Sequence, residues 1–79
     1  MKIPVIKKLA EDHDIPTLEK AEEAILNEEQ PAIEVLGDDE GEQLTHVLAA
    51  IEIRRSMEGG KTANEAVRAY SQRVRKSIS

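Results

Sequence analysis

The two histidines and the carboxylates beside them are the residues of this sequence that could bind a metal or carry acid–base chemistry. His13 stands between Asp12 and Asp14, and His46 follows Glu42 by four residues, a spacing that places both on one face of a helix. Neighbouring residues on a helix point in different directions, so the first cluster favours a solvated helix end. We therefore expect no metal at His13.

His46 does not complete a known metal motif either. Carboxylate-bridged di-iron bundles carry Glu-x-x-His on two helices, whereas Gln43 lies three residues before His46 and the chain has no second copy. The favoured interpretation is a partly buried imidazole hydrogen-bonded to a neighbouring carboxylate. A metal or small-molecule site around His46 and Glu42 stays as an alternative.

Two further strings resemble ligand-binding loops without matching them. In Gly59-Gly60-Lys61-Thr62, Arg55 occupies the position where a phosphate-binding loop requires its first glycine. The acidic run at residues 38–42 leads to Gln43 and Ala49 where a calcium-binding EF-hand loop needs glycine and glutamate. No nucleophile-elbow pattern accompanies the serines. The sequence thus predicts no catalytic residues, no cofactor and no enzymatic activity.

Composition limits the chain to one small domain spanning residues 1–79. Its apolar residues include nine alanines, Tyr70 is its single aromatic residue, and it has no cysteine for disulfides or thiolate metal sites. So thin a core predicts a homodimer or another protein partner. The apolar stretch at residues 3–6 is too short for a signal peptide or a membrane span, so we expect a cytoplasmic protein without a membrane partner.

Charge is divided unevenly along the chain. Residues 1–43 carry four Lys/Arg and thirteen Asp/Glu, a net of −9, and residues 44–79 carry seven and three, a net of +4. We favour the interpretation that the two halves attract each other within one compact fold. The alternative is that the basic half forms a surface for a nucleic acid or another partner.

Apolar periodicity predicts helices along most of the chain. The first has Pro4 in its first turn, although the β-branched residues at 2–6 also allow a strand. The second is expected at residues 18–29 with Thr17 as its N-cap. Residues 31–37 are extended, and we favour an irregular connector over a strand that pairs with residues 2–6. A central helix at residues 40–57 carries an apolar arc wide enough to contact several neighbours, and we expect a partner to cover part of it.

The strongest local signals surround the last helix. Gly59-Gly60 ends the central helix, and Thr62 and Glu65 form a capping box that starts a helix running to about residue 77. Together these elements predict an all-α fold, a small bundle of three to four helices with an extended connector at about residues 31–37.

Two charged surfaces are the candidate binding sites, and we expect them to serve protein–protein interaction, as in a small adaptor or regulatory subunit. The exposed side of the last helix carries Arg68, Gln72, Arg75 and Lys76, and the acidic run carries Asp38, Asp39, Glu40 and Glu42. A nucleic-acid-associated module using the same basic helix is the alternative. The net charge of −5 and the lack of aromatic stacking groups argue against nucleic acid.

Four strings carry a resemblance over nearly the full length: residues 3–9 (IPVIKKL), 31–35 (PAIEV), 37–51 beginning GDDEGEQLTH, and 72–78 (QRVRKSI). In these the chain resembles a family of short, cysteine-free bacterial proteins of unknown function, of the Bacteroidetes type. The resemblance implies a bacterial cytosolic protein. It implies no activity, and none of the strings is a catalytic or binding motif.

Overall fold

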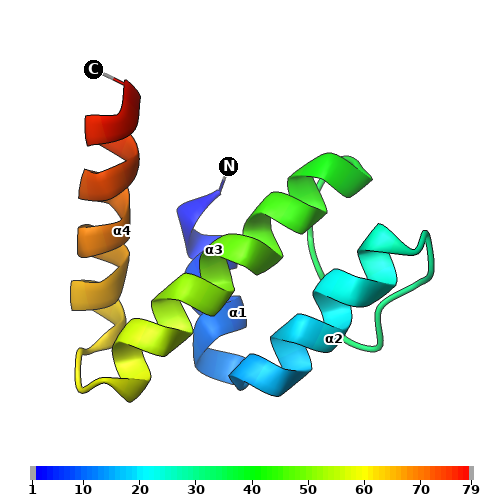
Figure 1. Cartoon of the computed structure of the whole chain (residues 1–79), viewed down its shortest axis with the longest axis horizontal. Helices are drawn as coiled ribbons and strands as arrows, with labels where there is room; N and C mark the ends of the chain where they lie inside the picture. Colours follow the sequence, from blue (N-terminus) through cyan, green and yellow to red (C-terminus); the bar gives the residue numbers. More distant parts are fainter. Residues whose placement is uncertain (1, 79) are drawn as a thin grey trace.

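The computed structural model describes the backbone of residues 2–78 and the side chains of residues 2–75, and within them it contains four helices and no strand. These are α1 (Ile3–Asp12), α2 (Ile15–Leu26), α3 (Glu40–Glu58) and α4 (Ala63–Ile78). Helix α3 crosses the middle of the molecule, with α4 at one edge and α2 at the other (Figure 1). The all-α fold is confirmed, and so is the irregular connector between α2 and α3.

The core forms around α3, because α1, α2 and α4 all pack against it and α1 also contacts α4. These helices cover most of the apolar arc of α3, since Ala49, Ala50, Ile51 and Ile53 are buried, whereas Leu48 of the same helix remains 43% exposed. The buried apolar residues are Ile6, Leu9, Ala10, Leu18, Ala21, Ile25, Val35, Val47, Ala49, Ala50, Ile51, Ile53 and Ala66.

Helix α2 begins earlier than predicted. Its N-cap is Asp14, whose Oδ1 accepts a hydrogen bond from the backbone N–H of Thr17 at 3.0 Å, so Thr17 lies inside the first turn. Pro16 is tolerated there because the first turn of a helix has no intrahelical partners for its N–H groups. The prediction of Thr17 as the cap was therefore wrong.

Helix α2 also ends earlier, at Leu26 rather than at residue 29. The N–H of Glu29 donates to the carbonyl of Ala24 at 2.8 Å, and that of Glu28 to the carbonyl of Ile25 at 3.1 Å, which together form a Schellman turn. Glu28 occupies its left-handed position with a φ of 59°, where glycine is favoured. Glycine takes the equivalent place after α3, where Gly60 has a φ of 111°.

The capping box that precedes α4 is confirmed. The N–H of Glu65 donates to Oγ1 of Thr62 at 3.2 Å, and the N–H of Thr62 donates to Oε1 of Glu65 at 2.9 Å. We expect Thr62→Ala to lower the free energy of unfolding by about 1 kcal/mol, because one N–H of the first turn loses its acceptor. Urea unfolding followed by circular dichroism measures this. Asn64→Ala, at an exposed position of the same turn, is the matched control and should change it by less than about 0.5 kcal/mol.

Two of these caps make stability depend on pH. Hydrogen bonds from the side chain and backbone of Thr17 lower the pKa of Asp14 below its ordinary value of 3.8. Hydrogen bonds from the backbone and side chain of Thr62 lower the pKa of Glu65 below its ordinary value of 4.5. A carboxylate with a lowered pKa stabilises the fold fully above its unfolded-state pKa, and this contribution is lost as the pH falls through the folded-state pKa. Stability should therefore fall below about pH 5.

The double variant Asp14→Asn/Glu65→Gln tests this dependence. Both amides can still accept the capping hydrogen bonds, but neither titrates. Denaturant unfolding at a series of pH values should show a smaller loss of stability on acidification in the variant than in the wild type. Equal losses in both proteins would contradict the assignment of these two carboxylates.

The two halves of the sequence meet mainly through the apolar core. Arg55 in the basic half lies 4.0 Å from Glu19 in the acidic half, whereas Arg73 pairs with Glu52 at 3.5 Å within the basic half. Helix α4 lies at one edge of the molecule and the connector lies toward the opposite edge (Figure 1). Attraction between the halves therefore does not account for the charges of α4.

Candidate interaction surfaces

The outer side of α4 carries three exposed polar residues at helical spacing, Arg68, Gln72 and Arg75, which we call the basic face. Arg68 and Arg75 form no hydrogen bond or ion pair with any residue whose side chain the structure describes. The side chain of Lys76, which the sequence placed on this face, lies outside the described residues. The basic face is therefore a surface of exposed guanidinium groups without an ion pair to the described side chains, although Arg68 lies near enough to Glu65 to interact with its charge.

Arg73 has a different role, because it turns toward α3. Its guanidinium pairs with Glu52 at 3.5 Å and lies 6.0 Å from the centre of the Tyr70 ring. Burial, with the nearby Glu52 carboxylate, raises the pKa of Tyr70. These contacts attach the inner side of α4 to α3 and leave the basic face on the outside.

The acidic run lies at the start of α3, and half of it is used in capping that helix. Oδ1 of Asp39 accepts the N–H of Glu42 at 2.8 Å, and Oε1 of Glu42 accepts the N–H of Asp38 at 2.8 Å. The side chains of Asp38 and Glu40 are exposed. The structure therefore does not bring the acidic run and the basic face together in one site.

Beside the acidic run lies a surface depression that the sequence did not predict, which we call the acidic hollow. It is about 550 Å³ in volume, and an adjoining depression of about 420 Å³ shares Ile25, Glu28 and Glu40 with it. No lysine or arginine lines either part. The apolar residues that line the two parts are Ile25, Leu26, Pro31, Ile33, Val35 and Leu44. The carboxylates that line them belong to Glu28, Glu29, Glu34 and Glu40.

The hollow escaped prediction because it depends on how α2 ends. The sequence placed Glu28 and Glu29 on the water-facing side of a longer helix, whereas the Schellman turn folds them back beside the start of α3. The same turn leaves Leu26 61% exposed, the largest exposure among the large apolar side chains that the structure describes. A glutamate in left-handed conformation has no strong local signal that would have revealed this.

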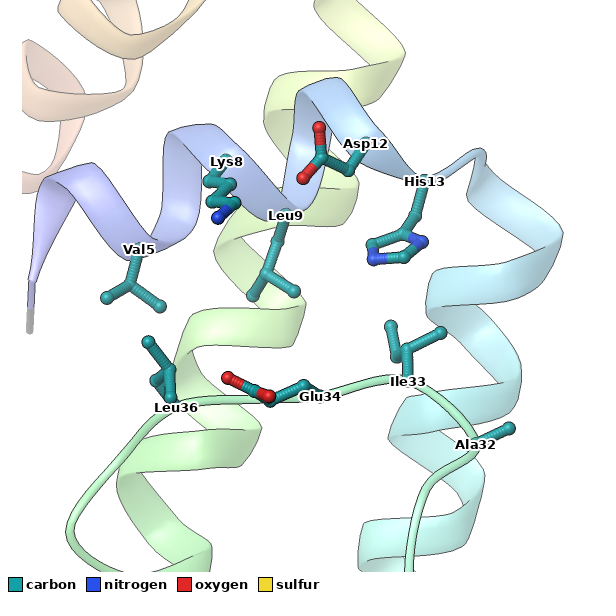
Figure 2. A pocket seen from close by; sticks show the side chains of 9 residues that line it. All are labelled: Val5, Lys8, Leu9, Asp12, His13, Ala32, Ile33, Glu34 and Leu36. Atoms are coloured by element: carbon teal, nitrogen blue, oxygen red, sulfur yellow. The ribbon is translucent and has the colours of Figure 1, made fainter.

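A second concave surface lies between α1 and the connector, with a volume of about 450 Å³. Val5, Leu9 and His13 point from α1 toward the connector, and Ile33 and Leu36 point back toward them (Figure 2). Its charged lining consists of Lys8, Asp12 and Glu34. This α1 groove has the size and mixed lining of small-ligand pockets, and it is where the structure places the cluster around His13.

His46 is completely buried and hydrogen-bonds to the segments on both sides of the α1 groove, the start of α1 and the connector. Its Nδ1 lies 2.7 Å from the carbonyl oxygen of Leu36, and its Nε2 accepts a hydrogen bond from the backbone N–H of Lys2 at 3.1 Å. These partners require a neutral imidazole with its proton on Nδ1. The predicted hydrogen bond to a carboxylate was wrong, because two backbone groups from distant segments occupy both nitrogens.

This arrangement bears on the alternative of a metal site around His46 and Glu42. Neither imidazole nitrogen has a lone pair free for a metal, and the carboxylate of Glu42 accepts the N–H of Asp38. Within the described residues, no three histidine, aspartate or glutamate side chains are grouped so that they could hold a metal ion.

None of the helices in the described part of the chain combines the length and the apolar character needed to cross a bilayer.

Comparison with known proteins places the whole sequence in one family. The model of the DUF6952 family, a family of unknown function, matches residues 1–79. The chain belongs to this family. The resemblance to a family of unknown function is thereby confirmed. No curated protein and no solved structure matches this DUF6952 sequence.

Proposed function

We propose that this DUF6952 protein is a non-enzymatic protein-interaction module, an adaptor or regulatory subunit of the bacterial cytoplasm, and that its basic face binds an acidic surface of a protein. The observation that carries the proposal is the exposed pair Arg68 and Arg75, which form no ion pair with the described side chains and lie on the outer side of a helix whose inner side is packed. Arginine suits this role because its planar guanidinium binds carboxylates through two parallel hydrogen bonds.

The net charge and the place of the aromatic ring argue against a nucleic-acid partner. The chain carries a net charge of −5, which opposes approach to a phosphate backbone, and its one aromatic ring, Tyr70, lies against α3 rather than on the basic face.

An affinity pull-down from lysate of the source organism, with and without nuclease, tests the proposal. Wild type should capture a defined protein that survives nuclease treatment and is lost with Arg68→Glu/Arg75→Glu. Lys8→Glu/Lys20→Glu, which reverses two exposed charges on α1 and α2, is the matched control and should retain it. Recovery of nucleic acid, or of proteins that disappear with nuclease, would overturn the proposal in favour of nucleic-acid binding.

A further inference from the structure

The basic face and the acidic hollow are complementary surfaces that one molecule cannot bring together. Helix α4, which carries the basic face, lies at one end of the longest axis of the molecule, along which the chain extends 31 Å, and the end of α2 and the start of α3, which line the hollow, lie toward the other end (Figure 1). Charges in water at physiological salt are screened beyond about 8 Å. The two surfaces therefore do not compensate each other within one molecule.

We propose that the basic face of one molecule binds the acidic hollow of a second copy, so that the chain associates head to tail. This inference rests on the proposed function and names the partner of the basic face. Arg68 and Arg75 lie about 10 Å apart along α4, on a side that has no apolar residue of its own between them. Their aliphatic stems can cover the apolar floor at Ile25 and Leu26 while the guanidinium groups reach Glu28 and Glu40.

The floor of the hollow gives this contact more than charge. Leu26 is 61% exposed and stands beside carboxylates that have no basic neighbour lining the hollow. Burying it beneath an arginine stem removes apolar surface from water at the same time as it pairs the charges. Because the hollow offers both an apolar floor and carboxylates, it favours binding of a helix surface that carries arginines over binding of a small cation.

The position of the two surfaces decides the symmetry of the assembly. A closed dimer with two-fold symmetry needs the same patch on both molecules, or two patches that face each other reciprocally. Surfaces at opposite ends instead give a heterologous contact, which leaves one basic face and one hollow open after each step. Association is therefore expected to continue beyond a dimer as the concentration rises.

We also expect the contact to be weak. A standard protein interface buries about 800 Å² on each partner, about a seventh of the 5259 Å² surface of this chain, and the ends offer less. Ion pairs at a solvated interface weaken as salt rises. We expect a dissociation constant for self-association of about 10 µM to 1 mM at low salt. At about 500 mM NaCl the affinity should be at least tenfold lower.

Sedimentation velocity of two neutralised variants, alone and mixed, tests the inference. Arg68→Gln/Arg75→Gln removes the charge of the basic face and keeps the hollow. Glu28→Gly/Glu29→Gln weakens the hollow and keeps the basic face, and glycine at position 28 suits the left-handed backbone, so loss of association cannot be ascribed to unfolding. Each variant alone should remain monomeric at about 0.2 mM and about 50 mM NaCl.

The equimolar mixture is the decisive sample. It contains one intact basic face and one intact hollow for each pair, so a complex of one copy of each variant, and nothing larger, is expected. A mixture that stays monomeric while wild type associates would overturn head-to-tail pairing and indicate a symmetric contact. Wild type that remains monomeric up to about 1 mM at low salt would overturn the inference. Failure of the proposed function would appear instead as a wild-type pull-down that recovers no protein after nuclease treatment.

Discussion

Replacing His46 with leucine is expected to lower the free energy of unfolding by about 3 kcal/mol. Leucine has a similar volume, so the loss comes from hydrogen bonding rather than from a cavity. The carbonyl of Leu36 and the N–H of Lys2 both lose their imidazole partner in part-buried hydrogen bonds, and leaving a polar group unsatisfied away from water costs about 1–3 kcal/mol. Urea unfolding of wild type and variant measures the difference.

The other histidine provides the control for this substitution. His13 is half-buried at the end of α1, and its backbone N–H, rather than its side chain, caps the helix through the carbonyl of Leu9. His13→Leu should therefore change the free energy of unfolding by less than about 0.5 kcal/mol. A loss below about 1 kcal/mol in His46→Leu would contradict the role assigned to the buried imidazole.

The second large effect is expected at Gly37, at the end of the connector. A Cβ atom at this position would lie 2.8 Å from Cγ of Gln43 and 2.9 Å from its backbone nitrogen, closer than atoms pack without displacement. The nitrogen belongs to the first turn of α3 and cannot move without disturbing the helix. We expect Gly37→Ala to lower the free energy of unfolding by about 2 kcal/mol.

Gly41 offers a matched glycine in the neighbouring turn. A Cβ atom there would be 3.4 Å from Oδ1 of Asp39, an ordinary contact, and the residue lies inside α3. Gly41→Ala should leave stability unchanged or raise it by up to about 1 kcal/mol, because alanine favours the helix. Similar effects of the two alanines in denaturant unfolding would show that the close approach at Gly37 does not constrain the connector.

Local sequence signals correctly predicted the helix ends that are formed by residues close together in the sequence. Thr62 and Glu65 define the start of α4 through hydrogen bonds three residues apart, and Gly60 supplies the left-handed position after α3. The ends of α2 were misplaced because Asp14 and Thr17 are both good caps, and because Glu28 occupies a position that glycine normally marks.

The candidate surfaces were predictable only where one helix carries them. Arg68, Gln72 and Arg75 share a face by helical spacing alone, so the basic face followed from the sequence. The acidic hollow needs Glu28 beside Glu40, and the His46 contacts join residue 46 to residues 2 and 36. Tertiary packing brings these groups together, and no spacing along the chain encodes it.

The position of Tyr70 gives this protein a spectroscopic reporter. It is the single aromatic residue of the chain, and it contacts the core where α4 meets α3, beside Glu52 and Arg73. Tyrosine fluorescence and near-ultraviolet circular dichroism therefore follow the docking of α4, whereas far-ultraviolet circular dichroism follows all four helices. Coincident transitions of the two signals would indicate all-or-none unfolding, and an earlier tyrosine transition would measure the free energy with which α4 detaches from the other three helices.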